Sequence, residues 1–161
     1  MKNEPTRIFD LVNYRQHTYP TSAIFSHKEN NRWTEISNVE FQQKVDDISK
    51  GLIALGVQPN AKVGIVSENR IEWSLLDFAI QQIGAIVVAL YPNISDNDYH
   101  YIFNHAEINV AIISSKSLYE RIDQLKSTIP QLRNTFILED GSLYPHWNMI
   151  LQTGKVISDK E

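Results

Sequence analysis

The chain has 161 residues, 42% of them hydrophobic, with a formal net charge of −4 and no cysteine. This length and apolar content predict one domain with a substantial core, and they exclude disordered and fibrous classes. The absence of cysteine excludes disulfides and thiolate metal sites, and the acidic balance without any block of Lys or Arg argues against a nucleic-acid partner.

Targeting signals are missing from the sequence. Residues 1–16 lack the apolar core of a signal peptide. No run of the chain approaches the roughly 18 apolar residues of a membrane-spanning helix. We therefore expect a cytoplasmic protein.

The N-terminal part of the chain predicts a short helix and then a β-hairpin. Residues 8–14 form an amphipathic pattern typical of a helix. Two strand-like pieces follow within residues 23–37, on either side of the polar residues 29–31. The hairpin that they predict need not belong to the main sheet, and we interpret its Trp33 as a packing residue.

Four predicted helix starts share one capping pattern, in which a short polar side chain lies three residues before a carboxylate. The four pairs are Ser37 with Glu40, Asn69 with Glu72, Ser95 with Asp98, and Ser117 with Glu120. The helix that follows the first pair continues along a periodic apolar stripe to Gly56, a residue type suited to the left-handed position after a helix.

Residues 62–91 predict a strand, a helix and a second strand. The apolar runs at 63–66 and 86–90 are rich in β-branched residues and suit strands that are buried on both faces. The apolar residues between them repeat at the i, i+3, i+4, i+7 spacing of a helix that lies on a sheet. This order predicts a βαβ unit with parallel strands and a right-handed crossover.

The same alternation continues to the end of the chain. The further elements that we predict are a helix at 95–107, a strand at 110–113, a helix at 117–128, a strand at 135–138 and a short helix at 147–151. This pattern predicts an open, mostly parallel α/β sheet with helices on both faces, plus the N-terminal hairpin. We expect residues 1–153 to form this unit and residues 154–161 to be a linker or a truncated end.

Catalytic motifs are absent from the sequence. The six glycines lie too far apart to form a GxGxxG or Walker-type phosphate loop, and no GxSxG elbow occurs. The closest histidines, His100 and His105, would point about 140° apart on a helix, so we predict no metal site. Asp46 and Asp47 would point about 100° apart, and we interpret them as charges on a solvated helix face.

Candidate binding residues follow the first two predicted parallel strands. Ser67 and Asn69 come after one strand, and Tyr91 and Asn93 come after the other. In open α/β sheets, ligands bind beyond the carboxyl ends of the strands. We therefore interpret these four residues as candidates for contact with a substrate or cofactor, although Asn69 already has a structural role as a predicted helix cap.

Residues 51–114 resemble the N-terminal region of the adenylate-forming enzymes, and most of all the long-chain fatty acyl-CoA synthetases. The matching features, in order, are LGV at 55–57, SENRIEW at 67–73, GA at 84–85, LYP at 90–92 and YIFNHAE at 101–107. The WTEIS segment at 33–37 also lies where this family has its opening hairpin.

The resemblance implies a two-step ligase as the parent protein. Such enzymes join ATP and a fatty acid into an acyl-adenylate with release of pyrophosphate, and coenzyme A then takes the acyl group as AMP leaves. It implies ATP, Mg²⁺ and coenzyme A as cofactors of the parent, and it leaves peripheral membrane attachment open. The family's phosphate loop and C-terminal domain lie beyond the matched region, so we expect the 161 residues alone to be inactive.

Two kinds of partner follow from this reading. One is the C-terminal remainder of the enzyme, and the other is a second copy of the chain, bound through the surface that the remainder would cover. Two alternatives to the fatty-acid reading remain open: a stand-alone, non-catalytic α/β interaction module, and another acyl or aryl adenylate-forming ligase. A gene that continues past codon 161 into a glycine-rich phosphate loop distinguishes the fragment from the module.

Overall fold

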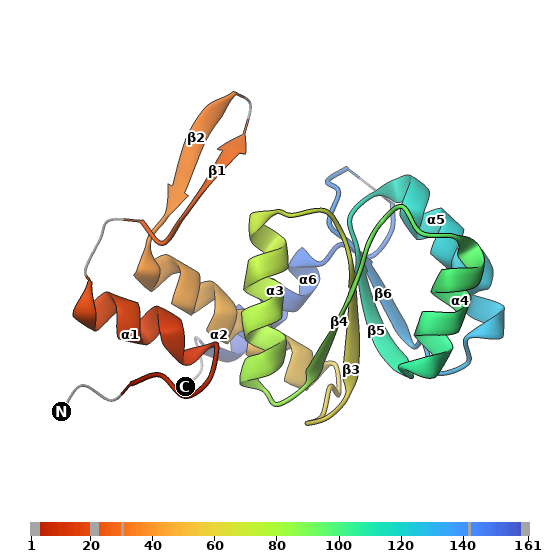
Figure 1. The fold of residues 1–161 in the computed structure, drawn as a ribbon, viewed down its shortest axis with the longest axis horizontal. Helices are drawn as coiled ribbons and strands as arrows, with labels where there is room; N and C mark the ends of the chain where they lie inside the picture. The colour runs from red at the N-terminus through yellow and green to blue at the C-terminus, as the bar shows by residue number, and fades with distance from the viewer. Residues whose placement is uncertain (1–3, 20–22, 30, 142, 159–161) are drawn as a thin grey trace.

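The computed structural model describes residues 4–19, 23–29, 31–141 and 143–158, which form a parallel sheet between two layers of helices (Figure 1). The sheet contains β3 (Lys62–Val66), β4 (Ile86–Leu90), β5 (Ile108–Ile113) and β6 (Asn134–Ile137) in the order β4-β3-β5-β6, and every neighbouring pair is parallel. This architecture confirms the predicted fold class.

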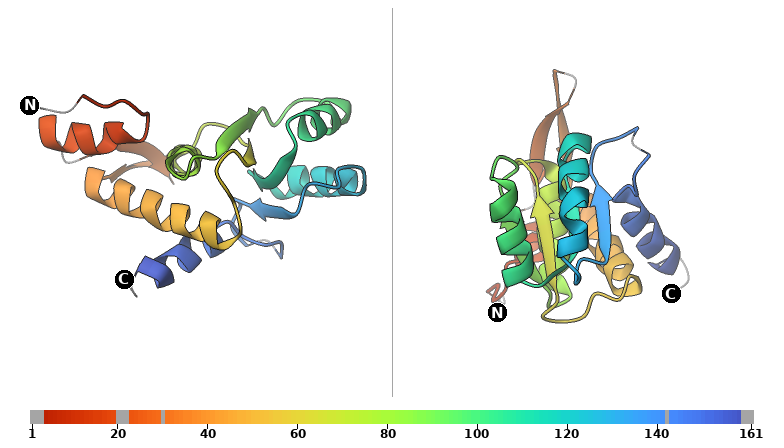
Figure 2. Two further views of the ribbon diagram at one scale, coloured as in Figure 1. Left: turned by 90° about the horizontal axis from the view of Figure 1, so that it is seen from below. Right: turned by 90° about the vertical axis from the view of Figure 1, so that its right-hand side faces the viewer.

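Most of the helices lie on the two faces of the sheet, whereas the first packs against the second instead (Figure 2). The helices are α1 (Asp10–Thr18), α2 (Asn38–Ala54), α3 (Ile71–Gln82), α4 (Asp96–His105), α5 (Lys116–Leu125), the short 3₁₀ helix η1 (Lys126–Thr128) and α6 (Asn148–Ser158). Alternate residues of β5 enter two separate cores: Val110 and Ile112 join α2, α3 and α6, whereas Ala111 and Ile113 join α4 and α5. This two-residue period explains why the apolar run of β5 is continuous. None of the described helices is both long and apolar enough to cross a membrane.

The predicted hairpin is confirmed, and it projects away from the rest of the molecule (Figure 1). It consists of β1 (Phe25–Glu29) and β2 (Arg32–Ile36), paired antiparallel. Its base is anchored by the Phe25 ring, whose centroid lies 4.9 Å from that of Phe41 on α2. The interpretation of Trp33 as a packing residue is wrong, because its side chain is 72% exposed on the projecting part.

Two of the predicted helix caps are confirmed. The backbone N–H of Glu40 donates to Ser37 Oγ over 3.1 Å at the start of α2. At the start of α4, Ser95 and Asp98 form a complete capping box, in which each side chain accepts from the backbone N–H of the other residue. Both pairs satisfy N–H groups that have no partner inside the helix.

The other two predicted caps are wrong. Helix α3 begins at Ile71 with Arg70 as its N-cap residue, so Asn69 lies outside the capping position. Helix α5 begins at Lys116, whose backbone N–H donates to the Glu139 carboxylate over 2.6 Å. A carboxylate from the loop after β6 therefore takes the role that Ser117 was predicted to have.

The prediction that residues 86–90 are buried on both faces is also wrong. β4 is the last strand of the sheet on one side, Ile86 is 45% exposed, and Ala89 is exposed. An edge strand has a neighbour on one side only, so its apolar composition does not ensure burial.

The structure corrects the prediction of a linker or truncated end for residues 154–158, whereas residues 159–161 lie outside the described residues. Helix α6 continues to Ser158, and Gly154 is buried where α6 crosses α2. A Cβ atom on Gly154 would overlap the carbonyl oxygen of Asp47, and one on Gly51 would overlap that of Ile150. The two glycines permit backbone contact between the helices, so residues 154–158 continue a helix that packs on α2.

The interpretation of Asp46 and Asp47 as solvated charges is wrong as well. Asp47 is only 4% exposed, and its Oδ1 accepts a hydrogen bond from Ser158 Oγ on α6 over 2.8 Å. Asp46 Oδ1 accepts one from Gln82 Nε2 of α3, also over 2.8 Å. The two carboxylates point to different neighbours, and each links α2 to another helix.

Candidate functional site

The carboxyl ends of the four parallel strands meet at one edge of the sheet. The loops that follow them carry the predicted binding residues and the starts of α3, α4 and α5. This is the edge at which open α/β sheets bind ligands. The structure divides it into two parts, one at the loop after β3 and one at the loop after β4.

The loop after β3 contains Ser67 and Asn69. Ser67 is 8% exposed, and its hydroxyl donates to the carbonyl oxygen of Glu68 over 2.9 Å, so this side chain is engaged within the chain. Asn69 is exposed and lines an open groove with a volume of about 1060 Å³. Of the four predicted residues, Asn69 is the one that lines this groove.

The groove lies between the base of the hairpin, α2, the start of α3 and the start of α6. Its apolar lining consists of Phe25, Ile36, Ile71, Leu75, Trp147 and Leu151. Its polar lining includes Lys44, whose Nζ lies 3.0 Å from Glu40 Oε1 one helical turn away. The groove therefore has a mixed lining, in which the polar and charged residues outnumber the apolar ones, whereas most small-molecule pockets are lined mainly by apolar side chains.

Arg70 and Glu72 form the best-defined ion pair of the groove. Arg70 donates two hydrogen bonds to the Glu72 carboxylate, of 2.8 Å from Nε and 3.0 Å from Nη2. Partial burial of Glu72 opposes its ionisation, but the hydrogen bonds and the charge of Arg70 outweigh burial and lower the pKa of Glu72. The same hydrogen bonds raise the pKa of Arg70, helped by the charges of Glu68 and Asp140. Both groups are therefore ionised at neutral pH.

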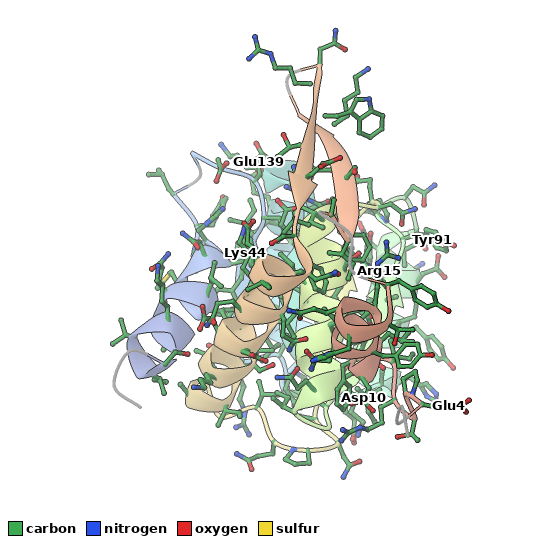
Figure 3. The ribbon with its side chains drawn as sticks, turned by 90° about the vertical axis from the view of Figure 1, so that its left-hand side faces the viewer. Glu4, Asp10, Arg15, Lys44, Tyr91 and Glu139 are labelled. Carbon is green, nitrogen blue, oxygen red and sulfur yellow. The ribbon has the colours of Figure 1, made fainter. Side chains whose placement is uncertain are left out.

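The loop after β4 holds Tyr91 and Asn93 apart from the groove. Neither residue lines the groove, and Tyr91 is 76% exposed. Figure 3 shows Tyr91 and Lys44 on opposite sides of the hairpin base. The four predicted residues therefore do not converge on one cavity.

Two side chains from other elements hold this second loop in place. The hydroxyl of Tyr99, a fully buried residue of α4, donates to the carbonyl oxygen of Tyr91 over 2.8 Å. Arg121 of α5 donates to the carbonyl oxygen of Ile94 over 2.6 Å, pairs with Asp96, and places its guanidinium carbon 5.0 Å from the centroid of the Tyr99 ring. The path of the β4–α4 loop is thus set from α4 and α5.

The described residues do not fit the phosphates of ATP. Their glycines lie in turns (Gly56, Gly84 and Gly141), at the α2–α6 crossing (Gly51 and Gly154) and inside β3 (Gly64). None of these positions forms the glycine-rich loop whose backbone N–H groups cradle a phosphate chain. Within the same residues, no group of three or more His, Asp or Glu side chains is arranged to hold a metal ion.

Sequence reasoning missed the charged and aromatic lining of the groove. Lys44, Arg70 and Trp147 come from α2, the loop before α3 and the segment before α6. No short motif joins residues that lie so far apart in sequence. The signal that was available is the position of Arg70, four residues after the end of a predicted strand, and the assignment of Asn69 as a helix cap obscured it.

Comparison with known proteins identifies related sequences. A family model described as AMP-binding enzyme matches residues 13–158. The chain is 31% identical over 114 residues to a long-chain-fatty-acid–CoA ligase of Mycobacterium bovis, covering 71% of this chain and 19% of that protein. It is 24% identical over 163 residues to one of Xenopus laevis, covering 98% and 22%. The chain thus spans about a fifth of the length of these relatives.

Solved structures share the fold of the chain. A long-chain-fatty-acid–CoA ligase of Archaeoglobus fulgidus superposes with a TM-score of 0.76 at 14% identity, covering 91% of this chain and 29% of that one. An anthranilate CoA ligase in complex with anthranoyl-AMP superposes with a TM-score of 0.73 at 20% identity, covering 89% and 26%. At these identities the likeness concerns the fold alone.

Proposed function

Because this chain belongs to the AMP-binding enzyme family, we propose that it is the N-terminal part of a long-chain fatty acid–CoA ligase. The observation that carries this proposal is the match over residues 13–158, together with two relatives that are both named long-chain-fatty-acid–CoA ligases. The proposed parent reaction converts a fatty acid, ATP and coenzyme A into acyl-CoA, AMP and pyrophosphate through an acyl-adenylate, with Mg²⁺ as the metal.

The chemistry of this reaction explains why further chain is required. A carboxylate oxygen is a poor leaving group, and adenylation converts it into a good one before the thiol attacks. The adenylation step needs donors that hold the phosphates and stabilise developing charge. Since the described residues carry no such phosphate cradle, we propose that the 161 residues support the active site and that the remainder of the parent supplies its catalytic groups.

Within the parent, we propose that the loops beginning at Ser67 and Tyr91 face the substrate or cofactors, with Asn69 and Asn93 as their contact residues. Their position at the carboxyl edge of the sheet supports this assignment. Asn69→Ala or Asn93→Ala in the longer protein is expected to raise KM for one substrate while leaving the melting temperature unchanged. An unchanged KM for ATP, fatty acid and coenzyme A in both variants would remove these residues from the proposal.

The first experiment reads the gene beyond codon 161. We expect it to encode a Gly-, Ser- and Thr-rich loop that ends in lysine, followed by the remaining domains of a ligase. A stop codon there would instead favour a stand-alone interaction module. If the longer protein exists, palmitate and anthranilate compared as substrates decide between a fatty-acid ligase and an aryl ligase, the class represented by the anthranilate CoA ligase with the same fold.

The second experiment uses the purified 161-residue chain. With ATP, Mg²⁺, palmitate and coenzyme A, we expect no pyrophosphate release above the protein-free background. A complete long-chain-fatty-acid–CoA ligase serves as the positive control. Pyrophosphate release in proportion to the concentration of the 161-residue chain would contradict the proposal that the remainder of the parent supplies the catalytic groups.

The substrate of the proposed reaction bears on where the longer protein lies in the cell. We place the longer protein in the cytoplasm, with peripheral attachment to membranes where its fatty acid substrate partitions. Cell fractionation tests this: the protein is expected in the cytosolic fraction and in a membrane fraction from which high salt or carbonate extracts it. Resistance to carbonate extraction would show integral insertion and would contradict peripheral attachment.

A further inference from the structure

The two edge strands of the sheet differ in whether another segment of the chain forms backbone hydrogen bonds with their outer side. At the β6 edge, Ile137 exchanges backbone hydrogen bonds with the segment that follows: its N–H donates to Pro145 over 2.9 Å, and its carbonyl accepts from Trp147 over 3.0 Å. The chain thus covers part of this edge itself. At the opposite edge, β4 pairs with β3 alone among the described residues.

The hydrogen-bonding pattern shows which groups of β4 face outward. The backbone N–H of Ile86 donates to Ala61 on the β3 side over 2.8 Å. In a parallel pair, successive residues direct their N–H and C=O groups alternately to one side and the other. Val87 and Ala89 therefore direct both groups away from β3, toward the open edge. These groups form a short template for another strand.

β4 carries none of the usual protections of an edge strand. Its residues, Ile86–Leu90, are all apolar and include no Lys, Pro or Gly. Its register with β3 runs without a bulge from the first residue to the last. Natural edge strands are commonly blunted by a charge, a proline or a bulge. In Figure 1, β4 lies at the viewer's side of the sheet, with α3 and α4 on either side of it.

We propose that β4 is a self-association site, at which β4 of a second copy pairs antiparallel about a two-fold axis at Val88. In this register Val87 of one copy and Ala89 of the other exchange both backbone hydrogen bonds, and the symmetry repeats the exchange. The two sheets then form one continuous sheet. The inference concerns the 161-residue chain and is independent of the proposed reaction; in the longer protein, further chain that pairs with β4 would compete with the second copy.

The composition of β4 favours a second copy as the occupant. Centred on Val88, the pairing places Ile86 opposite Leu90 of the other copy and Val88 opposite itself. No charge meets a like charge, and apolar cross-strand pairs are favourable. The strand also matches its own length, so no outward group at its centre is left without a partner. An exposed five-residue strand is a small contact compared with the roughly 1,200–2,000 Å² of a stable interface, so the dimer is weak and dissociates on dilution.

Sedimentation equilibrium over a dilution series tests the proposal. The wild-type chain is expected to show a reversible monomer–dimer equilibrium. Ala89→Lys places a charge on the exposed side of β4 without entering the core, and it is expected to weaken the dimer at least tenfold. Ile53→Lys is the matched control, because Ile53 on α2 is 54% exposed and lies outside the proposed interface; its dimerisation is expected to equal that of the wild type.

Hydrogen exchange gives an independent readout at the backbone. In the concentrated wild-type chain, the amides of Val87 and Ala89 are expected to be protected, and this protection is lost on dilution or in Ala89→Lys. The amides of β3 and β5 stay protected in both proteins and report that the fold is intact. A chain that remains monomeric at all concentrations overturns the proposal. So does a dimer that persists in Ala89→Lys, because another surface must then carry it.

Discussion

Single residues decide how closely the helices of this molecule approach one another. Gly51 and Gly154 lie on facing sides of α2 and α6, at positions where any side chain would overlap the backbone of the other helix. Glycine inside a helix costs about 1 kcal/mol relative to alanine. The close crossing, and the hydrogen bond between Asp47 and Ser158 that it permits, offset this cost.

Gly154→Ala is expected to destabilise the chain. The added methyl group forces the helices apart, an overpacking effect that reaches about 3 kcal/mol, and the better helix propensity of alanine returns about 1 kcal/mol. We therefore expect a net loss of about 2 kcal/mol in the free energy of unfolding, measured by urea denaturation. Gln152→Ala, an exposed substitution on the same helix, is expected to change it by less than about 0.5 kcal/mol. Equal stability of the two variants would contradict the close crossing.

The capping box of α4 makes stability depend on pH. The Ser95 hydroxyl, and then the Ser95 backbone N–H, donate to the Asp98 carboxylate and lower the pKa of Asp98. A carboxyl group whose pKa is lower in the folded chain contributes stability above its unfolded pKa, and this contribution is lost as the pH falls through the folded value.

Asp98→Asn should therefore reduce stability at neutral pH, with a difference from the wild type that shrinks in acid. Urea denaturation at pH 7 and below about pH 4 measures this. Asp123→Asn, on the exposed side of α5, serves as the control for the loss of one surface carboxylate. A stability difference between Asp98→Asn and the wild type that stays constant with pH would contradict the assigned role of the carboxylate.

Helices α4 and α5 hold the loop after β4 in place, although this loop belongs to neither helix. Tyr99 and Arg121 reach across to the loop after β4 and bind its carbonyl oxygens. Burial raises the pKa of the Tyr99 hydroxyl, so this group remains a protonated donor throughout the neutral range. The loop that carries Tyr91 and Asn93 is therefore positioned by the helix layer on the other side of the sheet from α3.

Tyr99→Phe removes one hydrogen bond from this arrangement and keeps the ring. We expect a loss of about 1 kcal/mol in the free energy of unfolding and faster amide exchange in residues 91–94. The control is Tyr101→Phe on the same helix, where the side chain is 63% exposed and the expected change is close to zero. Unchanged exchange in the loop of Tyr99→Phe would show that the hydrogen bond does not hold it.

The whole molecule depends on helix α6, whose second half was predicted to be a linker or a truncated end. α6 packs along α2, and its Ile150 is 1% exposed within the core that also contains α3 and one face of the sheet. The chain therefore folds as one unit in which residues close to the C-terminus complete the core begun by α2. Removal of α6 therefore takes away part of the helix layer that covers one face of the sheet.

Deletion of residues 148–161 is expected to abolish cooperative unfolding. It removes the buried Ile150 and uncovers the side of α2 that carries Asp47 and Gly51, and a domain with a total stability of only about 5–15 kcal/mol tolerates such a loss poorly. Far-UV circular dichroism during urea titration measures the transition. A sharp transition with an unchanged midpoint would show that α6 is dispensable.

The sequence by itself determined the class of the fold and the order of its elements. Periodicity distinguishes strand from helix because side-chain direction repeats every 2 residues in one and every 3.6 in the other, and the caps at Ser37 and Ser95 act within one turn of the chain. The family resemblance also rests on local strings such as residues 67–73. These features depend on neighbours in sequence, so they could be predicted.

Only the tertiary structure decided which surfaces are covered and which residues meet. The edge position of β4, the burial of Gly154, and the cap that Glu139 supplies to α5 all depend on contacts between residues far apart in the chain. The groove beside Asn69 likewise combines the hairpin, α2, α3 and α6. Local pattern carries no information on these distances, because burial is a property of the packed layers and not of any one segment.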